Sequence, residues 1–180
     1  EQVQGCRIAY VQSDEITLLL TDYDTLTTEA WFNYEVQKMC SVAASIATAA
    51  FSRAWNRGGP SALFDARFWS VPTHEVTNAF IWRQQDATRN SIQMLGQAHF
   101  SHKRLHGVDT KAMQDLLMLE KGINWNDCPT VQKRGACIVR ESYEGPNGST
   151  RTRWVVDREI PIFTQNRAYI EQHVAPRENP

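Results

Sequence analysis

The stretch "AYVQSDEITLLL", residues 9 to 20, contains two β-favouring runs with a short polar segment between them. Residues 6–11 and 16–21 are rich in apolar and β-branched side chains, which is typical of strands. The connection lacks the Asn-Gly or Asp-Gly pair of a tight turn and carries Ser13, Asp14 and Glu15 instead. We therefore predict a hairpin whose tip presents two adjacent carboxylates.

This acidic tip has two interpretations. Carboxylates on a short strand connection are held rigidly, and two divalent ions about 4 Å apart need such fixed oxygen ligands to promote phosphoryl transfer. On this interpretation Asp14 and Glu15 bind metal, with Ser13 beside them. The alternative is an ordinary solvated turn, because Ser and Asp are common turn residues.

A two-metal site needs at least one further carboxylate from elsewhere in the chain. Asp65 and Asp86 are the candidates. Either could instead form a structural ion pair, Asp65 with Arg67 and Asp86 with Arg83. The sequence alone therefore does not decide which residue would supply the further carboxylate.

Outward from the hairpin, the spacing of apolar residues predicts three long helices, over residues 27–55, 73–100 and 110–121. Thr27 or Thr28 can cap the first of them. Its apolar positions recur every three to four residues, so they define one buried face. These positions are Phe32, Val36, Met39, Ala43, Ile46, Ala50 and Ala54.

The remaining segments favour strands and loops. Residues 62–72 read as an interrupted strand and residues 122–135 as a loop. Residues 136–143 and 151–159 flank a Gly- and Asn-containing turn, which predicts a second hairpin. Strands and helices in this mixed order predict an α+β fold with helices against a largely antiparallel sheet.

One face of the second helix carries polar side chains at helical spacing. They could be ordered groups that bind phosphate or base edges, or they could form an internal hydrogen-bond network. Lys38 on the first helix is equally open, since it could lay its stem along apolar neighbours or contact a triphosphate. The polar face comprises Arg83, Asp86, Asn90, Gln93 and Gln97.

The chain has 180 residues, 42% of them apolar, which suits one domain with a sizeable core. Its formal net charge is −1, so a polyanion must be held by local basic patches. His99, His102 and His106 could bind a metal, although without a cysteine or carboxylate nearby they favour a mildly basic surface or an RNA contact. The basic patches comprise Lys103, Arg104, Lys133, Arg134, Arg151 and Arg153.

The cysteine pattern indicates the compartment. The four cysteines are far apart in the sequence and form no Cys-x-x-Cys pair, which favours reduced thiols and a cytoplasmic location. No apolar run approaches the roughly 20 residues of a membrane span, so we expect no membrane partner.

Several segments together resemble the histidine-tRNA guanylyltransferase family and its relatives, the 3′-to-5′ nucleotide-adding polymerases. The matching segments are "YVQSDEITLLL", "VQKMCSVAAS", "LFDARFW", "IWRQQDATRNS" and "EKGINWNDCPTVQKRG". The resemblance implies a palm-like α+β fold of the polymerase and cyclase type, Mg²⁺ dependence and a homotetramer. It also implies that ATP or GTP activates a tRNA 5′ end, which the 3′-hydroxyl of an incoming nucleotide then attacks.

The resemblance also implies roles for particular residues. Asp14 matches the second metal carboxylate of the family and Glu15 its acidic neighbour, with Ser13 beside them as a further catalytic position. Lys38 and Ser41 match positions that bind the nucleotide triphosphate.

A second group of matching positions is implied to bind RNA. It comes from the polar face of the second helix and from a basic loop near residue 134. The group comprises Arg83, Asp86, Asn90, Lys133 and Arg134.

The sequence departs from the family pattern in three places. The family's first metal carboxylate lies on an earlier strand, so either an N-terminal strand–helix segment is absent from this chain or the site is incomplete. The family's His-Ile-Asn-Asn element reads Thr-Arg-Asn-Ser at residues 88–91, and its Lys-Asn-Glu-Leu-Leu element lacks the lysine near residues 114–117. These two losses resemble the branch that repairs shortened tRNA 5′ ends.

We therefore expect a catalytic palm-like domain over residues 1–157 and a C-terminal extension over residues 158–180. The expected function is a nucleotidyltransferase that extends the 5′ end of tRNA. The alternatives are a catalytically silent tRNA-binding module, favoured by the missing first carboxylate, and a nucleotide cyclase of similar palm architecture.

Overall fold

The computed structural model describes residues 2–55 and 62–175, and the acidic tip forms as predicted. Strands β1 (Cys6–Gln12) and β2 (Glu15–Leu20) pair in antiparallel fashion, with Gln12 opposite Glu15. Only Ser13 and Asp14 remain between the strands, and Ser13 takes a positive φ of 49°. A two-residue connection of this kind fits the right-handed twist of the strands when its first residue has φ above zero. The predicted hairpin is confirmed.

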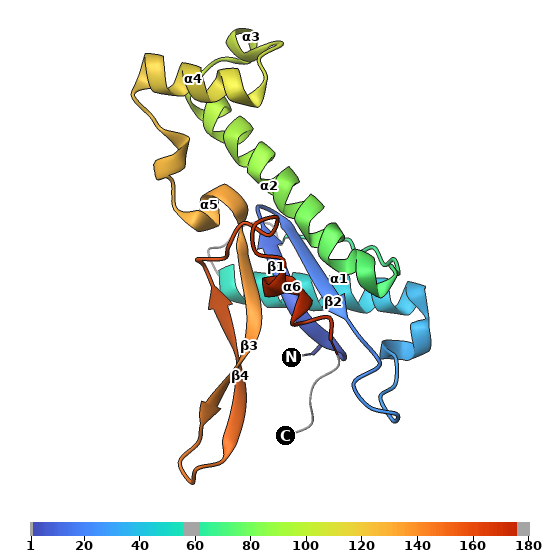
Figure 1. Cartoon of the computed structure of the whole chain (residues 1–180). Coiled ribbons are helices and arrows are strands. Elements are labelled where there is room, and N and C mark those ends of the chain that lie inside the picture. Colours follow the sequence, from blue (N-terminus) through green and yellow to red (C-terminus); the bar gives the residue numbers. More distant parts are fainter. Residues whose placement is uncertain (1, 56–61, 176–180) are drawn as a thin grey trace.

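The sheet has four strands in the order β2-β1-β3-β4, and all neighbours are antiparallel. Strands β3 (Ala136–Glu144) and β4 (Thr150–Asp157) form the second predicted hairpin. Strand β1 pairs with β3 only through residues 9–11. The rest of the β3–β4 hairpin therefore extends away from the body of the molecule (Figure 1).

Helix α2 (Val76–His99), preceded by the 3₁₀ turn η2 (Thr73–Glu75), packs across the sheet and buries the main core. The segment after β4, which includes α6 (Ala168–Glu171), closes the same core. Gln84 of α2 holds this segment at two points, because its amide donates to Pro161 O at 2.9 Å and accepts from Phe163 N at 2.8 Å. The core comprises Ile8, Tyr10, Leu19, Val76, Phe80, Ala87, Cys137, Ile160, Phe163, Ile170 and Val174.

A smaller core lies at the C-terminal end of α2. Helix α4 (Thr110–Lys121) crosses α2 where Gly96 lets Met113 approach, since a Cβ at Gly96 would lie 2.2 Å from the Met113 sulfur. Helix α3 (His102–Leu105) connects the two helices. The predicted loop at residues 122–135 is partly wrong, because it contains the 3₁₀ turn η3 (Trp125–Asp127) and helix α5 (Thr130–Arg134).

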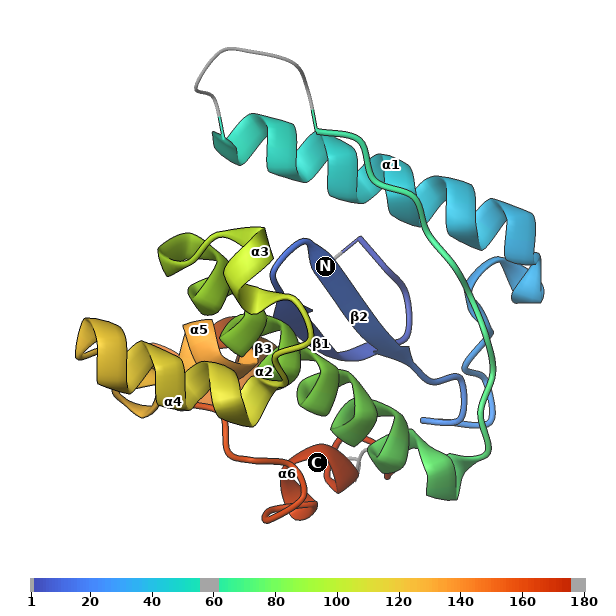
Figure 2. The same cartoon turned by 90° about the horizontal axis from the view of Figure 1, so that it is seen from above.

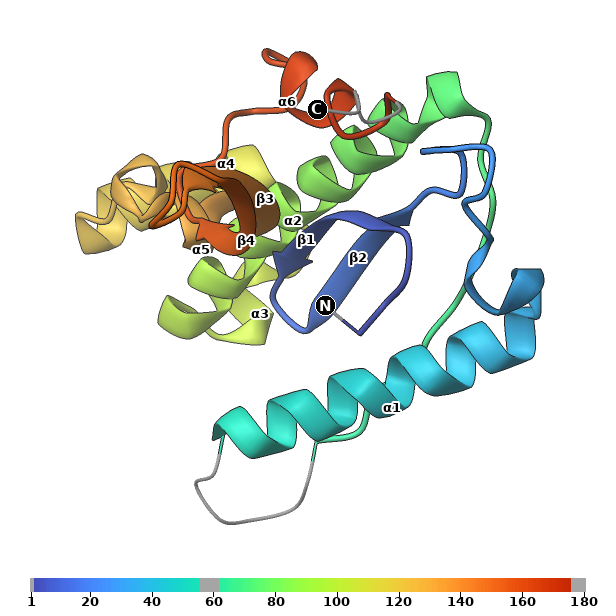
Figure 3. The ribbon, with the colours of Figure 1, turned by 90° about the horizontal axis from the view of Figure 1, so that it is seen from below.

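Helix α1 (Val36–Trp55) lies apart from the sheet (Figures 2 and 3). The predicted start at Thr27 or Thr28 is wrong, because the 3₁₀ turn η1 (Trp31–Tyr34) precedes it with positive φ angles at residues 32–34. Of the predicted apolar face, Met39 is buried at 3% exposure and Ile46 is half-buried.

Residues 62–72 form no strand, contrary to prediction. They run in extended form along α1 (Figure 2), where Phe64 N donates to Thr48 Oγ1 at 3.1 Å and the Phe64 ring contacts Phe51. Their backbone is extended, as the β-favouring residues suggest, but it pairs with a helix side chain and not with the sheet. The α+β architecture itself is confirmed. Among the described residues, no helix has the length and apolar character that crossing a membrane requires.

Candidate functional site

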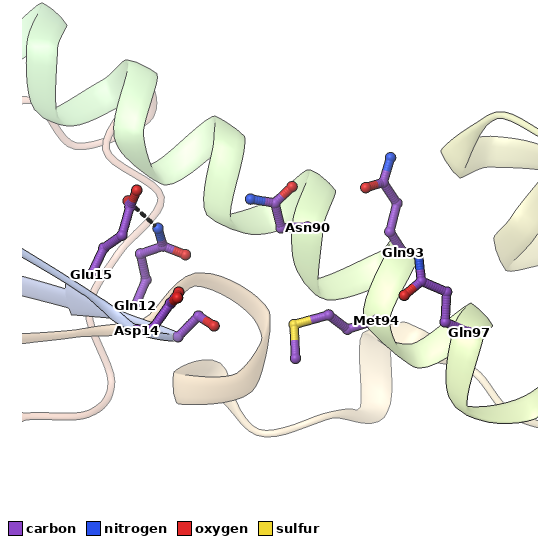
Figure 4. Close-up of a pocket in the computed structure, with 8 residues that line it drawn as sticks. Gln12, Asp14, Glu15, Asn90, Gln93, Met94 and Gln97 are labelled. Carbon is purple, nitrogen blue, oxygen red and sulfur yellow. Dashed lines mark hydrogen bonds between the residues drawn. The ribbon is translucent and has the colours of Figure 1, made fainter. Parts of the chain in front are cut away.

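A cavity of about 250 Å³ lies between the acidic turn and the polar face of α2. The hairpin supplies one wall, and the part of α2 between residues 90 and 97 supplies the other (Figure 4). Helical spacing explains the second wall, because positions three and four apart share one face. The lining residues are Gln12, Ser13, Asp14, Glu15, Asn90, Gln93, Met94 and Gln97.

The two carboxylates of the turn have different surroundings. Glu15 forms an ion pair with Arg83 of α2 and accepts a hydrogen bond from Gln12 Nε2 at 2.7 Å. The Arg83 side chain is 15% exposed, so the pair is partly shielded from water. Figure 4 shows Glu15 directed toward the turns of α2 that precede Asn90. Asp14 has no hydrogen bond or ion pair to any residue in 2–55 or 62–175 and is exposed at the cavity.

Because their surroundings differ, Asp14 and Glu15 can play different chemical roles. A carboxylate that already neutralises an arginine offers less charge to a cation than one that faces solvent. Of the two carboxylates, Asp14 is therefore the one whose charge is available to a cation. Glu15 would have to exchange Arg83 for the ion.

The polar face of α2 is partly an internal network and partly the cavity wall. Asp86 accepts hydrogen bonds from Arg89 and from Asn90 Nδ2, the latter at 3.3 Å. Asp86 is therefore committed to its own helix and does not line the cavity. The predicted alternative pair of Asp86 with Arg83 is replaced by Asp86 with Arg89 and by Arg83 with Glu15. The cavity wall is formed by the amide side chains of Asn90, Gln93 and Gln97.

A second, more apolar cavity of about 420 Å³ adjoins the first. It shares Gln12, Ser13, Asn90 and Met94 with the first cavity and continues between α2, η3 and α5. Its walls also include Ala87, Ser91, Leu95, Ala98, Trp125, Cys128, Val131, Gln132, Arg134 and Gly135.

Lys133 and Arg134, which were expected in a basic loop, are the last two residues of helix α5. Arg134 Nε donates to Ile160 O at 3.1 Å, and its own carbonyl accepts from the buried Tyr10 hydroxyl at 2.6 Å. Lys133 Nζ donates to Asn126 O at 2.5 Å and lies over the Trp125 ring, 5.8 Å from its centroid. Both cations thus hold α5 against its neighbours, and Arg134 also reaches the cavity wall.

Lys38 and Ser41 lie on α1 and line neither cavity. Lys38 Nζ sits 4.6 Å from the centroid of the Phe32 ring, and Ser41 Oγ donates to Lys38 O at 3.2 Å. The described part of the chain therefore does not bring the two predicted triphosphate-binding residues to the acidic turn.

No group of three or more His, Cys, Asp or Glu side chains that could hold a metal ion is found within residues 2–55 and 62–175. The histidine trio thus does not form such a group. Asp65 pairs with Arg67 at 3.4 Å, with both side chains more than 80% exposed, as the alternative interpretation proposed. A further carboxylate for a two-metal site is not supplied by these residues.

Sequence reasoning missed several residues of the site. Gln12 is the last residue of β1, and only its register opposite Glu15 shows that it orients that carboxylate. Trp125 lies in the segment that the sequence predicts to be a loop, yet its Nε1 donates to Ser91 Oγ at 3.0 Å and fixes the indole beside α2. A tryptophan within a polar segment is the one signal in the sequence, because an indole that packs against the protein needs a hydrogen-bond partner for its N–H group.

Comparison with known proteins gives the family. The family model described as tRNAHis guanylyltransferase matches residues 1–72. A solved bacterial tRNA(His) guanylyltransferase-like protein in complex with ATP is 50% identical, with a TM-score of 0.89 over 98% of this chain and 74% of that one. One in complex with GTP is 47% identical, with a TM-score of 0.82 over 96% of this chain and 71% of that one.

Two curated relatives show how much of their length the chain spans. Protein R259 of Acanthamoeba polyphaga mimivirus, itself uncharacterised, is 26% identical over 92% of this chain and 65% of its own length. The tRNA(His) guanylyltransferase of Debaryomyces hansenii is 27% identical over 96% of this chain and 69% of its own length. The chain thus spans about two thirds of the length of these relatives. On its match to the family model and its identity with the two bacterial structures, the chain belongs to the tRNAHis guanylyltransferase family.

Proposed function

We propose that the chain is the core of a nucleotidyltransferase that adds nucleotides to the 5′ end of a tRNA in the 3′-to-5′ direction. The observation that carries the proposal is Asp14, an unengaged carboxylate on a two-residue turn, facing an amide-lined cavity. Similarity to bacterial proteins bound to ATP and to GTP supports nucleoside triphosphates as substrates. The family description supports tRNA as the acceptor.

The residues of the cavity fit a Mg²⁺ ion bound largely through substrate phosphates. Mg²⁺ keeps several waters and is commonly held by one or two carboxylates together with phosphate oxygens. Asp14 supplies one such carboxylate, and Glu15 would supply a second on leaving Arg83. When bound there, the ion would neutralise phosphate charge and polarise the phosphoryl group. A second ion would require a carboxylate from outside residues 2–55 and 62–175.

The remaining residues act on substrate position. In the proposed reaction the tRNA 5′-phosphate is first joined to AMP from ATP with release of diphosphate. The 3′-hydroxyl of the incoming nucleotide then attacks that phosphorus, a phosphodiester forms and AMP leaves. Asn90, Gln93 and Gln97 can donate to phosphate or sugar oxygens, and Arg83 can move from Glu15 to a phosphate.

The test is extension of a 5′-truncated tRNA by the protein in the presence of ATP, GTP and Mg²⁺. Asp14→Asn keeps the size of the side chain but removes its charge, so extension should fall by about a hundredfold or more, as for loss of a group that stabilises transition-state charge. Asp65→Asn, at an exposed aspartate that lines neither cavity, is the matched control and should retain full extension. Equal activity of Asp14→Asn and the parent protein would refute the assignment of the turn.

A second function is favoured by one specific observation, the shortage of carboxylates in the described part of the site. A chain that could not complete the metal site would bind tRNA without adding nucleotides. Calorimetry separates the two functions, because only the enzyme should bind nucleoside triphosphate in a Mg²⁺-dependent manner.

The homotetramer and the cytoplasmic location stay predictions. The first rests on the family resemblance and the second on four cysteines that lie far apart in the sequence and form no Cys-x-x-Cys pair. Light scattering on the purified protein at several concentrations would test the tetramer directly.

A further inference from the structure

The ion pair between Arg83 and Glu15 joins two side chains that the proposed reaction needs separately. Glu15 belongs to the acidic turn, beside the carboxylate of Asp14, where a cation would be neutralised by it. Arg83 belongs to α2, and its guanidinium group can bind a phosphate. While the pair is intact, neither side chain offers its full charge to a ligand.

The carboxylate of Glu15 is held in place by a second donor. Arg83 Nη2 and Gln12 Nε2 both contact the same oxygen, Glu15 Oε2. Gln12 is only 8% exposed and lies opposite Glu15 in the β1–β2 register, so its amide stays beside the carboxylate when Arg83 is gone. On losing Arg83, Glu15 therefore keeps its position and recovers its charge.

Arg83 likewise has a support that does not depend on Glu15. Its Cζ atom lies 5.0 Å from the centroid of the neighbouring Trp82 ring, which is 62% exposed. Such a contact holds a guanidinium group near the ring face while its N–H groups stay available to an acceptor. Asp86, one turn further along α2, is paired with Arg89. An anion that replaced Glu15 would thus meet a positioned cation.

We propose that the Arg83–Glu15 pair makes the site select a triphosphate together with its divalent cation over either one alone. The proposal rests on the proposed function for the metal and phosphate at the turn, and it adds how the site distinguishes their complex from its parts. A free cation that took Glu15 would leave Arg83 without an anion, and a free polyphosphate that took Arg83 would leave Glu15 without a cation. The complex supplies both replacements at once, so it breaks the pair at the least cost.

The experiment measures the binding of inorganic tripolyphosphate by calorimetry in EDTA, which removes divalent cations. Glu15→Gln keeps the size of the side chain and releases Arg83, so the affinity should rise about three- to tenfold. Asp14→Asn removes the same charge from the adjacent residue without releasing Arg83. It is the charge-matched control, and its affinity should rise by no more than about twofold, because an exposed charge acts through water and salt.

Variants of Arg83 test whether this side chain carries the gain. With Arg83→Gln added, Glu15→Gln should bind tripolyphosphate no more tightly than Arg83→Gln alone. With Arg83→Lys added instead, part of the gain should remain, because the positive charge is kept but the two-pronged guanidinium contact is lost.

NMR of the arginine side chains gives an independent measurement on the parent protein, should Glu15→Gln fail to fold. The Arg83 signal is identified by its absence from Arg83→Gln. It should shift when Mg²⁺ and tripolyphosphate are added together, and much less when either is added alone at the same concentration.

Three outcomes would overturn the proposal and leave the proposed function intact. They are equal gains in Glu15→Gln and Asp14→Asn, a gain that persists without Arg83, and an Arg83 signal that shifts as far with one component as with both. Failure of the parent protein to bind ATP in Mg²⁺ would instead refute the proposed function and, with it, the selection by this pair.

Discussion

The ion pair between Arg83 and Glu15 controls how much negative charge the acidic turn presents. Arg83 comes from α2 and Glu15 from the first position of β2, so the pair also ties the helix to the hairpin. Gln12 contacts the same carboxylate from the other strand. With Glu15 engaged on two sides, Asp14 alone offers its full charge to a cation.

This arrangement makes a prediction about cation affinity. Arg83→Gln removes a positive charge beside the turn and releases Glu15, so the affinity of the turn for Mg²⁺ should rise by about three- to tenfold. Calorimetric titration with Mg²⁺ in the absence of nucleotide measures the effect. Arg89→Gln is the control, because Arg89 is paired with Asp86 on the next turn of the same helix. An unchanged affinity in Arg83→Gln would show that Glu15 does not reach the bound ion.

At the scale of single elements, the join between α5 and β3 depends on a glycine. Gly135 has φ of +83°, and a Cβ there would lie 2.4 Å from Val11 O of the neighbouring strand. Gly122, which ends α4, has φ of +66° but open space around it. Comparing the two positions therefore separates the cost of a left-handed backbone, which both share, from the cost of a steric clash, which arises only at Gly135.

Alanine at each glycine should give different losses of stability. Gly122→Ala should lower the free energy of unfolding by about 1–2 kcal/mol, the cost of a left-handed residue with a Cβ. Gly135→Ala should cost clearly more, because the strand pairing beside it must also shift. Urea denaturation of both variants measures the difference. Equal losses in the free energy of unfolding would mean that the backbone between β1 and β3 accommodates a methyl group at no additional cost.

Helix α1 gives a prediction about uneven burial along one face. Met39 is 3% exposed and Ile46 only half-buried, although both belong to the apolar face predicted from spacing. Met39→Asn should therefore lower the melting temperature more than Ile46→Asn, since loss of a well-buried side chain costs about 2–5 kcal/mol. Differential scanning calorimetry measures both. A larger effect at Ile46 would show that another part of the helix face is covered in the folded protein.

The local sequence pattern predicted helices and strands well wherever one apolar face determines the secondary structure. The two hairpins and the long helix α2 follow from alternation and helical spacing, and α4 begins and ends at the residues expected from its pattern. Local pattern failed where a segment pairs with something distant. Residues 62–72 have strand-forming residues, but their neighbour is α1, and no local rule specifies that neighbour.

The candidate site could likewise be predicted where local spacing decides it, and not where it depends on packing between distant segments. Asp14, Glu15 and Asn90 were predicted from the turn and the helical stripe, and they share one cavity. The ion pair of Glu15 and the role of Trp125 depend on how β2 and η3 pack against α2, which spacing along the chain does not encode. Ser41 was predicted from the family resemblance alone and Lys38 also from its place on the first helix, and the structure leaves both on a separate helix, α1.

At the scale of the whole molecule, three ionisable groups lie within or against the main core. Burial raises the pKa of Cys137 to about 12. Burial also raises the pKa of Tyr10, and burial together with a hydrogen bond to Asp157 raises that of Tyr169. The folded protein therefore holds protons at these groups that the unfolded chain releases at about pH 9 to 10.

Stability should consequently fall as the solution becomes alkaline. Above about pH 9 the unfolded state binds fewer protons than the folded state, so the free energy of unfolding decreases as pH rises. Melting temperatures between pH 8 and 10.5 measure the decrease. Tyr169→Phe removes one contributing group and should therefore make the fall shallower. A melting temperature that is constant over this range would contradict the burial of these groups.

The outer edge of β2 has a consequence for the chemistry of the turn. Within residues 2–55 and 62–175, β2 is the last strand of the sheet on that side, and its first residue is Glu15. Backbone groups along such an edge can hydrogen-bond an additional extended segment at a spacing of about 4.8 Å. A segment that paired with this edge would have one of its ends next to Asp14. Main-chain pairing along this edge would thus place an acidic side chain at that end of such a segment beside the Asp14 carboxylate.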